Sequence, residues 1–234
     1  RGPRGARVAQ DTGVLGPHAE ERRSAMHEKV LPKHTLELLK ELEKDPDPGL
    51  QGWTLAGGTG LALQIGHRVS DDLDFFRTDR QDVRTLHEPL GRRGQYETLQ
   101  EAEHTLTVLL RKTKLSFFDV RDPFLFKGIP FRFFTLADLR DIALMKLAAI
   151  SGRGSRKDFV DLYTMLREGP TLAEYFELFP KKYGKSRSNA YHVLKSLTYF
   201  EDAEAEPMPR MLVPFNWKEC KAFFVREAHS IVLR

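Results

Sequence analysis

The sequence has 234 residues, of which 41% are hydrophobic and 10% aromatic, so it can build the core of one large domain or of two small ones. Its net charge of +4 and pI of about 9.1 are compatible with a nucleic-acid partner, although 33 acidic residues accompany 37 basic ones. No apolar run approaches the ~20 residues of a membrane span, and the N-terminus shows no secretory pattern. The single cysteine, Cys220, excludes an internal disulfide, fits a reducing cytoplasm and is expected in the core.

The first part of the chain divides into an irregular segment and a helix. Residues 1–25 are rich in glycine, arginine and proline and have no apolar period, so we expect a disordered basic tail that either touches RNA or is only solvated. Between Val30 and Glu43, leucines recur on one face while lysine and glutamate fill the other, which predicts an amphipathic helix. The run from Asp45 to Gly49 contains two prolines and ends it.

The stretch from Trp53 to Phe76 has the most informative pattern in the chain. An apolar run long enough for a buried strand is followed by a glycine-rich turn at residues 57–60 and by a helical apolar pattern that stops at Gly66. A further apolar run at its end has the composition of a strand. The stretch therefore predicts strand, glycine turn, short helix and strand in succession.

Three carboxylates, Asp71, Asp72 and Asp74, lie at the start of that second strand. Side chains two apart on a strand point to the same face, so Asp72 and Asp74 are neighbours, while Leu73 and Phe75 face a core. Adjacent carboxylates repel each other, and a divalent cation such as Mg²⁺, which prefers oxygen ligands, removes that penalty. The plainer alternative is that Asp71 and Asp72 only cap or solvate the end of the strand.

The turn Gly57-Gly58-Thr59 supplies a complementary feature. Glycines let backbone N–H groups approach a ligand closely, and a helix N-terminus favours anions. A phosphate-binding turn beside a metal-binding carboxylate pair is the layout that phosphoryl or nucleotidyl transfer requires.

The remaining elements change type near residue 135. We expect a helix from Thr78 or Asp79 to about Gly91, then strands, and Thr135 is a good N-cap for a strongly apolar helix that follows. The chain is therefore divided into a core at 26–134 and a helical part at 135–234. Strands are expected at 96–99, 105–110, 115–120 and 129–134, and helices at 136–150, 155–166, 172–183, 190–200 and 217–232.

The central stretch resembles the nucleotidyltransferase toxins of the AbiEii/AbiGii type, which belong to the polymerase β-like superfamily. The resemblance rests on Gly57-Gly58-Thr59, on Asp72-Leu73-Asp74 at the family's spacing and on the His67-Arg68-x-Ser70 run before the acids, and it covers about Met26 to Leu166. It implies an α+β fold, in which a polymerase β-like nucleotidyltransferase core with a mixed sheet precedes a helical C-terminal part.

The resemblance also implies a catalytic set of Asp72, Asp74, Lys146 and Asp158, with Mg²⁺ or Mn²⁺ held by the first two. Lys146 and Arg153 would neutralise charge on the phosphates of an NTP. Two plainer readings stay open. Lys146 could reach the surface by snorkelling, and Asp158 could complete a helix N-terminus three residues after its cap.

Further residues are candidates for nucleotide binding. Lys114 could reach a phosphate from the edge of the sheet, and Arg68 could approach a phosphate or pair with an aspartate. Asp161 is interpreted as structural or supporting. The nucleotide-binding residues expected are Gly57, Gly58, Thr59, Lys114, Lys146, Arg153 and Arg68.

The third acid of the superfamily is the point at which this chain departs from the pattern. In this family it tends to follow a Lys-x-Asp pattern, and here Lys114 is followed by Leu115 and Ser116. Asp119 is the remaining candidate third metal ligand, but three residues along a regular strand it faces the other way, so it could serve only if the strand bulges. The alternative is an Asp at a strand end that faces solvent.

A second basic group lies in the helical part. Lys181, Lys182, Lys185 and Arg187, with Tyr183 and Tyr191 nearby, form either an RNA-binding patch or a solvated helix end. The eight histidines show no spacing typical of a zinc site.

Together these features lead to one functional hypothesis and one alternative. The hypothesis is a bacterial, cytoplasmic, Mg-dependent nucleotidyltransferase that moves an NMP from an NTP to an acceptor. By resemblance, the acceptor is RNA, such as the 3′ end of tRNA, or a protein side chain, and the enzyme is a type IV toxin with a cognate antitoxin. The alternative is a non-catalytic nucleotide- or RNA-binding relative on the same fold, because Ser116 stands where an acid is expected.

Overall fold

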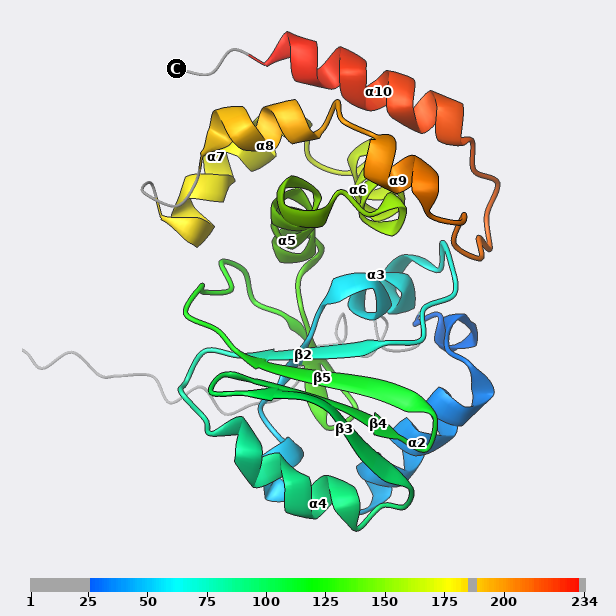
Figure 1. Cartoon of the computed structure of the whole chain (residues 1–234), viewed down its shortest axis with the longest axis vertical. Helices are drawn as coiled ribbons and strands as arrows, with labels where there is room; N and C mark the ends of the chain where they lie inside the picture. Colours follow the sequence, from blue (N-terminus) through cyan, green and yellow to red (C-terminus); the bar gives the residue numbers. More distant parts are fainter. Residues whose placement is uncertain (1–25, 185–188, 232–234) are drawn as a thin grey trace, which may run out of the picture.

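A seven-stranded mixed sheet lies at the centre of the computed structural model, which describes residues 26–184 and 189–231 (Figure 1). The strand order is β3-β4-β5-β2-β1-β7-β6, in which β2 runs parallel to β5, β1 runs parallel to β7, and the other neighbours are antiparallel. The sheet and the helices after it confirm the expected α+β class. The strands are β1 (Thr54–Leu55), β2 (Leu73–Arg77), β3 (Tyr96–Ala102), β4 (Thr105–Leu110), β5 (Thr113–Asp119), β6 (Ile129–Phe131) and β7 (Phe134–Leu136).

Helices cover both faces of this sheet (Figure 1). The amphipathic helix α2 (Lys33–Lys44) and the short α4 (His87–Gly91) lie against one face, where they enclose the first hydrophobic core. On the other face, α3 (Gly57–Ile65) lies between the sheet and the C-terminal helices, which share a second core. These helices are α5 (Leu139–Arg153), α6 (Arg156–Glu168), α7 (Leu172–Tyr183), α8 (Ala190–Ser196), α9 (Glu201–Ala205) and α10 (Trp217–Ser230).

Three short 3-10 helices complete the described elements. They are η1 (Glu28–Val30), η2 (Pro48–Leu50) and η3 (Val83–Leu86). Cys220 is fully buried in the second core, as expected. Within the ranges that the structure describes, no helix has the length and apolar character needed to cross a membrane.

The alternation of residues in β2 separates a core face from a functional face. Leu73 and Phe75 enter the first core, where the ring of Phe75 stacks on that of Phe117 with 5.2 Å between centroids. Trp53, which is fully buried, meets Phe117 edge-on at 5.0 Å. Asp74 takes the opposite face, which is the face directed toward the C-terminal helices. The period-two prediction for this strand is therefore confirmed.

The glycine turn is the first turn of a helix. α3 begins at Gly57, four residues earlier than its apolar pattern indicates, and ends at Gly66, whose φ of 67° makes it a left-handed C-cap. Gly57 itself has a φ of 62°, a region that other residues rarely adopt. Gly60 lies so close to β1 that a Cβ there would come within 2.9 Å of the Leu55 carbonyl oxygen. Glycine is thus required by backbone conformation at one position and by close packing at another.

Two expected elements around residue 135 are wrong. The single strand expected at 129–134 is a hairpin, because Arg132 has a φ of 52° and turns the chain between β6 and β7. Thr135 does not cap a helix, since its N–H donates to the Trp53 carbonyl oxygen inside β7. The N-cap of α5 is Asp138, whose side chain accepts from the N–H of Arg140 at 2.9 Å.

Other boundaries also differ from the expectations. Asp79 pairs with Arg77 instead of capping a helix, and the expected helix at 79–91 is η3 followed by α4, with Asp82 as the cap of η3. The helix expected at 190–200 ends at Ser196, and a separate helix, α9, begins at Glu201. The predicted disordered tail at residues 1–25 lies outside the described residues.

Gly60→Ala should destabilise the fold, because its methyl group would press against the backbone of β1. We expect a loss of about 1–3 kcal/mol in the free energy of unfolding, typical of overpacking. Gly91→Ala is the matched control, since a Cβ at Gly91 meets no atom within 4 Å. Thermal unfolding of both variants checks this. Equal melting temperatures for the two variants would contradict the packing account.

Candidate active site

The carboxylates of Asp72 and Asp74 face a polar cavity of about 730 Å³. Burial raises the pKa of Asp74 above its ordinary value, and the neighbouring charge of Asp72 raises it further. Asp72 has a partial counter-charge in Lys114, whose Nζ lies 3.6 Å from its Oδ2. The ionised form of Asp74 is therefore disfavoured by burial and by Asp72, and a bound cation would stabilise it.

The glycine turn closes around Asp74 from the side of α3. A Cβ on Gly57 would lie 2.8 Å from the Asp74 Oδ2, and one on Gly58 would overlap the guanidinium of Arg68. The N-cap of α3 is Ala56, which has no side-chain acceptor for the first N–H groups of the helix. Both glycines line the polar cavity, so an anionic group there can approach this helix N-terminus.

Thr59 has a different position from the one expected. Its side chain is buried, and its hydroxyl contacts the Ser70 Oγ at 2.8 Å and the carbonyl oxygen of Asp72. These bonds join the first turn of α3 to the segment that leads into β2. The Thr59 side chain thus fixes the carboxylate-bearing strand relative to the turn, which leaves only its backbone at the helix N-terminus.

A buried network of opposite charges lies behind this turn. Asp161 in α6 is fully buried and accepts from the Nε and Nη2 of Arg68, at 2.6 and 2.8 Å. It also accepts from the Nε2 of His67 at 2.8 Å, in the tautomer that places a proton there. Its Oδ2 lies 2.6 Å from the Nζ of Lys146. One carboxylate therefore contacts three basic side chains from two separate segments of the chain.

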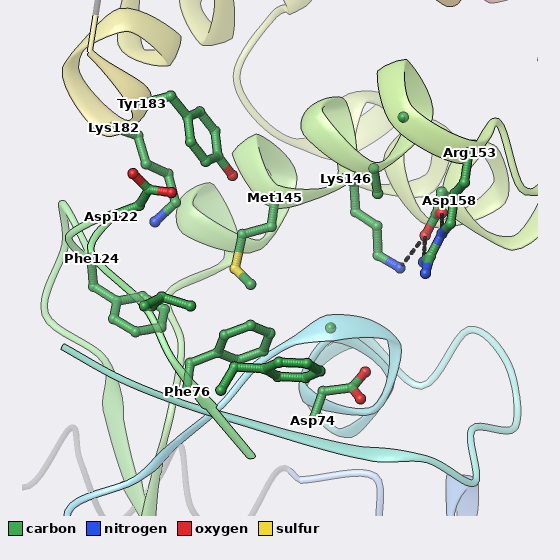
Figure 2. A pocket seen from close by; sticks show the side chains of 15 residues that line it. Asp74, Phe76, Asp122, Phe124, Met145, Lys146, Arg153, Asp158, Lys182 and Tyr183 are labelled. Atoms are coloured by element: carbon green, nitrogen blue, oxygen red, sulfur yellow. Dashed lines mark hydrogen bonds and ion pairs between the residues drawn. The ribbon is translucent and has the colours of Figure 1, made fainter. Parts of the chain in front are cut away.

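Lys146 extends the network to a second buried carboxylate. Its Nζ donates to the Asp158 Oδ1 at 2.8 Å, and Arg153 binds both oxygens of Asp158 at 2.8 and 3.0 Å (Figure 2). Lys146 is only 4% exposed, whereas the side chain of Arg153 is 59% exposed. The snorkelling interpretation of Lys146 is therefore wrong. Asp158 does more than complete a helix N-terminus, since it aligns both cations.

The protonation states of this network follow from the balance of burial and charge. Burial alone would lower the pKa of Lys146, but Asp161 and Asp158 outweigh it and raise the pKa. Burial alone would raise the pKa of Asp158 and Asp161, but the cations around each, first among them Lys146, lower both below the ordinary value. Lys146, Asp158 and Asp161 are therefore ionised at neutral pH.

Asp119 and Ser116 lie on opposite faces of β5. In the pairing of β2 with β5, Ser116 is the partner of Asp74 and lines the polar cavity beside it. Asp119 is buried at the other face, where its Oδ2 lies 2.9 Å from the Nδ1 of His104 and 3.8 Å from Arg80. β5 pairs with both neighbours without a bulge, so the register shift that would turn Asp119 toward Asp74 is not present. The expectation that Asp119 is a third metal ligand is therefore wrong, because its side chain lies on the face of β5 opposite to Ser116 and Asp74.

Within the described residues, no group of three or more His, Cys, Asp or Glu side chains is arranged to hold a metal ion. A cation bound at this site would therefore depend on Asp72 and Asp74 and complete its coordination with water or substrate oxygens. Mg²⁺ commonly binds in this way, with one or two carboxylates and several non-protein ligands.

Sequence reasoning missed part of the cavity lining. Lys29, Lys157 and Arg210 line the polar cavity together with Lys114, and they come from elements far apart in the sequence. Arg210 is held there by the backbone, because its carbonyl oxygen accepts from the N–H of Val69. No local motif marks these residues, and only the folded chain brings them together.

A second, apolar cavity of about 460 Å³ adjoins the first (Figure 2). Lys182 lines it and is buried against Asp141 at 2.8 Å, so it is not part of the solvated basic patch considered above. Of the other members of that patch, Lys181 and Tyr191 are exposed, Tyr191 by 71%. Lys185 and Arg187 lie outside the described residues.

Comparison with known proteins identifies the family. The profile of the family described as "Nucleotidyl transferase AbiEii toxin, Type IV TA system" matches residues 38–230. The chain belongs to this AbiEii family. It is also 38% identical over 179 residues to an uncharacterized protein of Aquifex aeolicus, an alignment that covers 74% of this chain and 84% of that one.

A solved structure shares the AbiEii fold at low sequence identity. MenT4, a nucleotidyltransferase toxin from Mycobacterium tuberculosis H37Rv, superposes with a TM-score of 0.52 at 14% identity, covering 94% of this chain and 91% of MenT4. The family resemblance expected from residues 57–74 is thereby confirmed over most of the chain. As a member of the AbiEii family, the protein is a nucleotidyltransferase of a toxin–antitoxin system.

Asp161→Asn should strongly destabilise the protein, because it leaves Arg68 and Lys146 buried without their shared counter-charge. Breaking a buried ion pair on one side costs about 3–5 kcal/mol, and denaturant titration measures it. Glu37→Gln is the control, since the exposed pair of Lys33 and Glu37 at 3.7 Å should contribute less than about 1 kcal/mol. Similar midpoints for both variants would show that the network carries little stability.

Asp74→Asn should have the opposite effect on stability at neutral pH. The folded protein raises the pKa of Asp74, so its ionised form is disfavoured relative to the unfolded chain at pH values above the folded pKa. We therefore expect the variant to unfold at higher denaturant concentration at pH 7. The gain should disappear below the unfolded aspartate pKa of about 3.9, where Asp74 is protonated in both states. Lower stability of Asp74→Asn at pH 7 would contradict the assignment.

Proposed function

We propose that this AbiEii protein transfers an NMP from an NTP to an RNA acceptor, with Mg²⁺ or Mn²⁺ bound at Asp72 and Asp74. The observation that supports it most is that Asp72 and Asp74 face a cavity that is also lined by the basic side chains of Lys29, Lys114, Lys157 and Arg210. A negatively charged pair in such surroundings suits a metal-bound triphosphate: the pair binds the cation and the basic side chains bind the phosphates. When bound, the metal would neutralise charge on the reacting phosphate and orient it for in-line attack.

The residues of the chain then have separate tasks. The N–H groups at the start of α3 would bind the phosphates, while the absence of side chains at Gly57 and Gly58 makes room for the Asp74 carboxylate and the Arg68 guanidinium. Arg153 is exposed enough to contact a phosphate directly. Lys146 is buried, and it would stabilise the negative charge of the phosphates as a fixed positive charge. Asp158 holds both cations in position. In this proposal the core at 26–134 supplies the carboxylates and the helical part at 135–234 supplies the main cations.

The basic rim of the polar cavity indicates the class of acceptor. Lys29, Lys114, Lys157 and Arg210 line it, and a polyanionic strand is the partner that such a set neutralises. A terminal RNA hydroxyl entering here would reach the Asp74 side of the nucleotide site. The 3′ end of tRNA is the acceptor we propose, which places the reaction in the bacterial cytoplasm, with a cognate antitoxin to counteract it.

The alternative is a relative that binds nucleotide or RNA without catalysis. Ser116 favours it, because this residue is the strand partner of Asp74 at the position where a third carboxylate would face the metal. Against it stands the cost of retaining Asp74 with a raised pKa, which binding alone does not require.

Transfer is tested by incubating the purified protein with Mg²⁺, total bacterial RNA and each NTP labelled at the α-phosphate, followed by gel electrophoresis. We expect label in the tRNA band with at least one NTP and a loss of at least 10²-fold in Asp74→Ala, because the metal site is removed. The matched control is Asp71→Ala, an exposed neighbouring aspartate, which should retain activity.

Two other outcomes would change the proposal. Label on the protein would move the acceptor to a side chain. An absence of label with folded protein and all four NTPs would favour the binding alternative and implicate Ser116.

A further inference from the structure

The apolar cavity beside the catalytic carboxylates has no task in the phosphate chemistry described above. It is lined by Phe76 and Phe118 from the sheet and by Met145 and Ala149 from α5, and Figure 2 shows Met145 opposite Phe76. At one end it shares Asp74, Lys146 and Arg153 with the polar cavity, and Figure 2 shows these three side chains at that end. A group held in the cavity would therefore be attached to, or in contact with, the reacting phosphates.

The walls of this cavity suit a flat aromatic ring. Phe76 and Phe118, on adjacent strands, stack on each other with 5.0 Å between centroids and 25° between planes, so each ring covers one face of the other and leaves its outer face and its edge for a ligand. Met145 lies opposite, and its flexible thioether adapts to a ring. Every nucleobase has a π-face that binds such a surface, whatever its hydrogen-bonding groups.

The far end of the cavity contains a buried cation, Lys182 (Figure 2). Its Nζ donates to the Asp141 Oδ1 at 2.8 Å and to the Pro123 carbonyl oxygen at 2.7 Å, and it lies 4.8 Å from the centroid of Phe124. Asp141 is fixed in turn by two backbone N–H groups, those of Leu125 and Phe126. An ammonium group has three N–H donors, so these two bonds leave one for a ligand.

We propose that the apolar cavity binds the nucleobase of the incoming nucleotide, and that Lys182 donates a hydrogen bond to an acceptor atom of that base. Lys182 is then a specificity-determining residue: an ammonium cannot accept, so a base that presents an amino group at this point leaves one N–H of the buried ammonium without an acceptor. This inference rests on the proposed function. The phosphates then lie at the Asp74 end of the polar cavity, and the basic rim of that cavity receives the acceptor strand, so that donor and acceptor meet at Asp74.

The assignment is tested by filling each cavity separately. Ala149→Phe places a ring in the apolar cavity, and Gln100→Trp narrows the polar one. Binding is measured calorimetrically with Mg²⁺ and α,β-methylene analogues of the four NTPs, and with inorganic tripolyphosphate as a probe that has no base. We expect Ala149→Phe to weaken the best nucleotide at least tenfold and tripolyphosphate less than twofold, whereas Gln100→Trp, in the cavity that binds the phosphates, should weaken both by a similar factor.

The outcomes separate this inference from the function on which it rests. Nucleotide binding by Ala149→Phe with wild-type affinity would overturn the base site and leave the proposed function intact. Wild-type protein that binds neither nucleotide nor tripolyphosphate would overturn both. Phe118→Leu, which shortens the aromatic surface without adding volume, serves as the second variant if Ala149→Phe unfolds, and it should also weaken nucleotides but not tripolyphosphate.

The role of Lys182 is tested by the ratio of affinities among the four analogues. Lys182→Met combined with Asp141→Asn removes both charges together, so that no buried ion remains unpaired. We expect the preference for the best nucleotide to fall about tenfold, with tripolyphosphate binding unchanged. An unaltered preference, or equal affinities of the wild type for all four analogues, would overturn the role of Lys182.

Discussion

The carboxylate of Asp161 is the interaction on which the arrangement of this active site depends. It is completely buried, and it binds Arg68 from the segment after α3 and Lys146 from α5. A buried carboxylate is stable only when cations and hydrogen bonds replace its lost hydration, so these groups must stay together wherever the fold is intact. The contact therefore fixes the helical part against the glycine turn. Arg68 in turn occupies the space that any side chain at Gly58 would need.

The fold shifts the pKa values of the carboxylates in this site in opposite directions. Asp158 and Asp161 have lowered pKa values because their cations are close, and both support the fold at neutral pH. Asp74 has a raised pKa, because burial and Asp72 disfavour its charge. The site thus keeps one carboxylate that is not neutralised by the protein itself. A bound cation would relieve this cost, which couples metal binding to stability.

Local signals in the sequence predicted the centre of the site well, and long-range contacts were beyond them. Strand periodicity predicted that Asp72 and Asp74 are neighbours, and both line the polar cavity. The helix after the glycine turn ends at Gly66, as its composition indicates. Thr135 was misassigned because a threonine before an apolar run satisfies the rule for an N-cap. Its N–H instead bonds to Trp53, a contact that depends on the parallel pairing of β1 and β7.

The contacts that the sequence did not reveal join distant residues. Asp161 and Arg68 are 93 residues apart in the sequence, and Lys182 and Asp141, which form an ion pair, are 41 residues apart. Lys182 looked like part of a solvated basic group, because neighbouring lysines give no sign of which one enters the interior. The apolar cavity is equally invisible in the sequence, since its walls come from the sheet, from α5 and from the end of α7.

The measurement that tests this account most directly is a crystal structure of the protein with Mn²⁺ and an α,β-methylene NTP, in which anomalous scattering locates the metal. The account predicts Mn²⁺ on the oxygens of Asp72 and Asp74, phosphates at the N-terminus of α3 beside Arg153, and the base between the sheet and α5. A metal bound elsewhere, or a nucleotide whose phosphates lie away from Asp74, would contradict it.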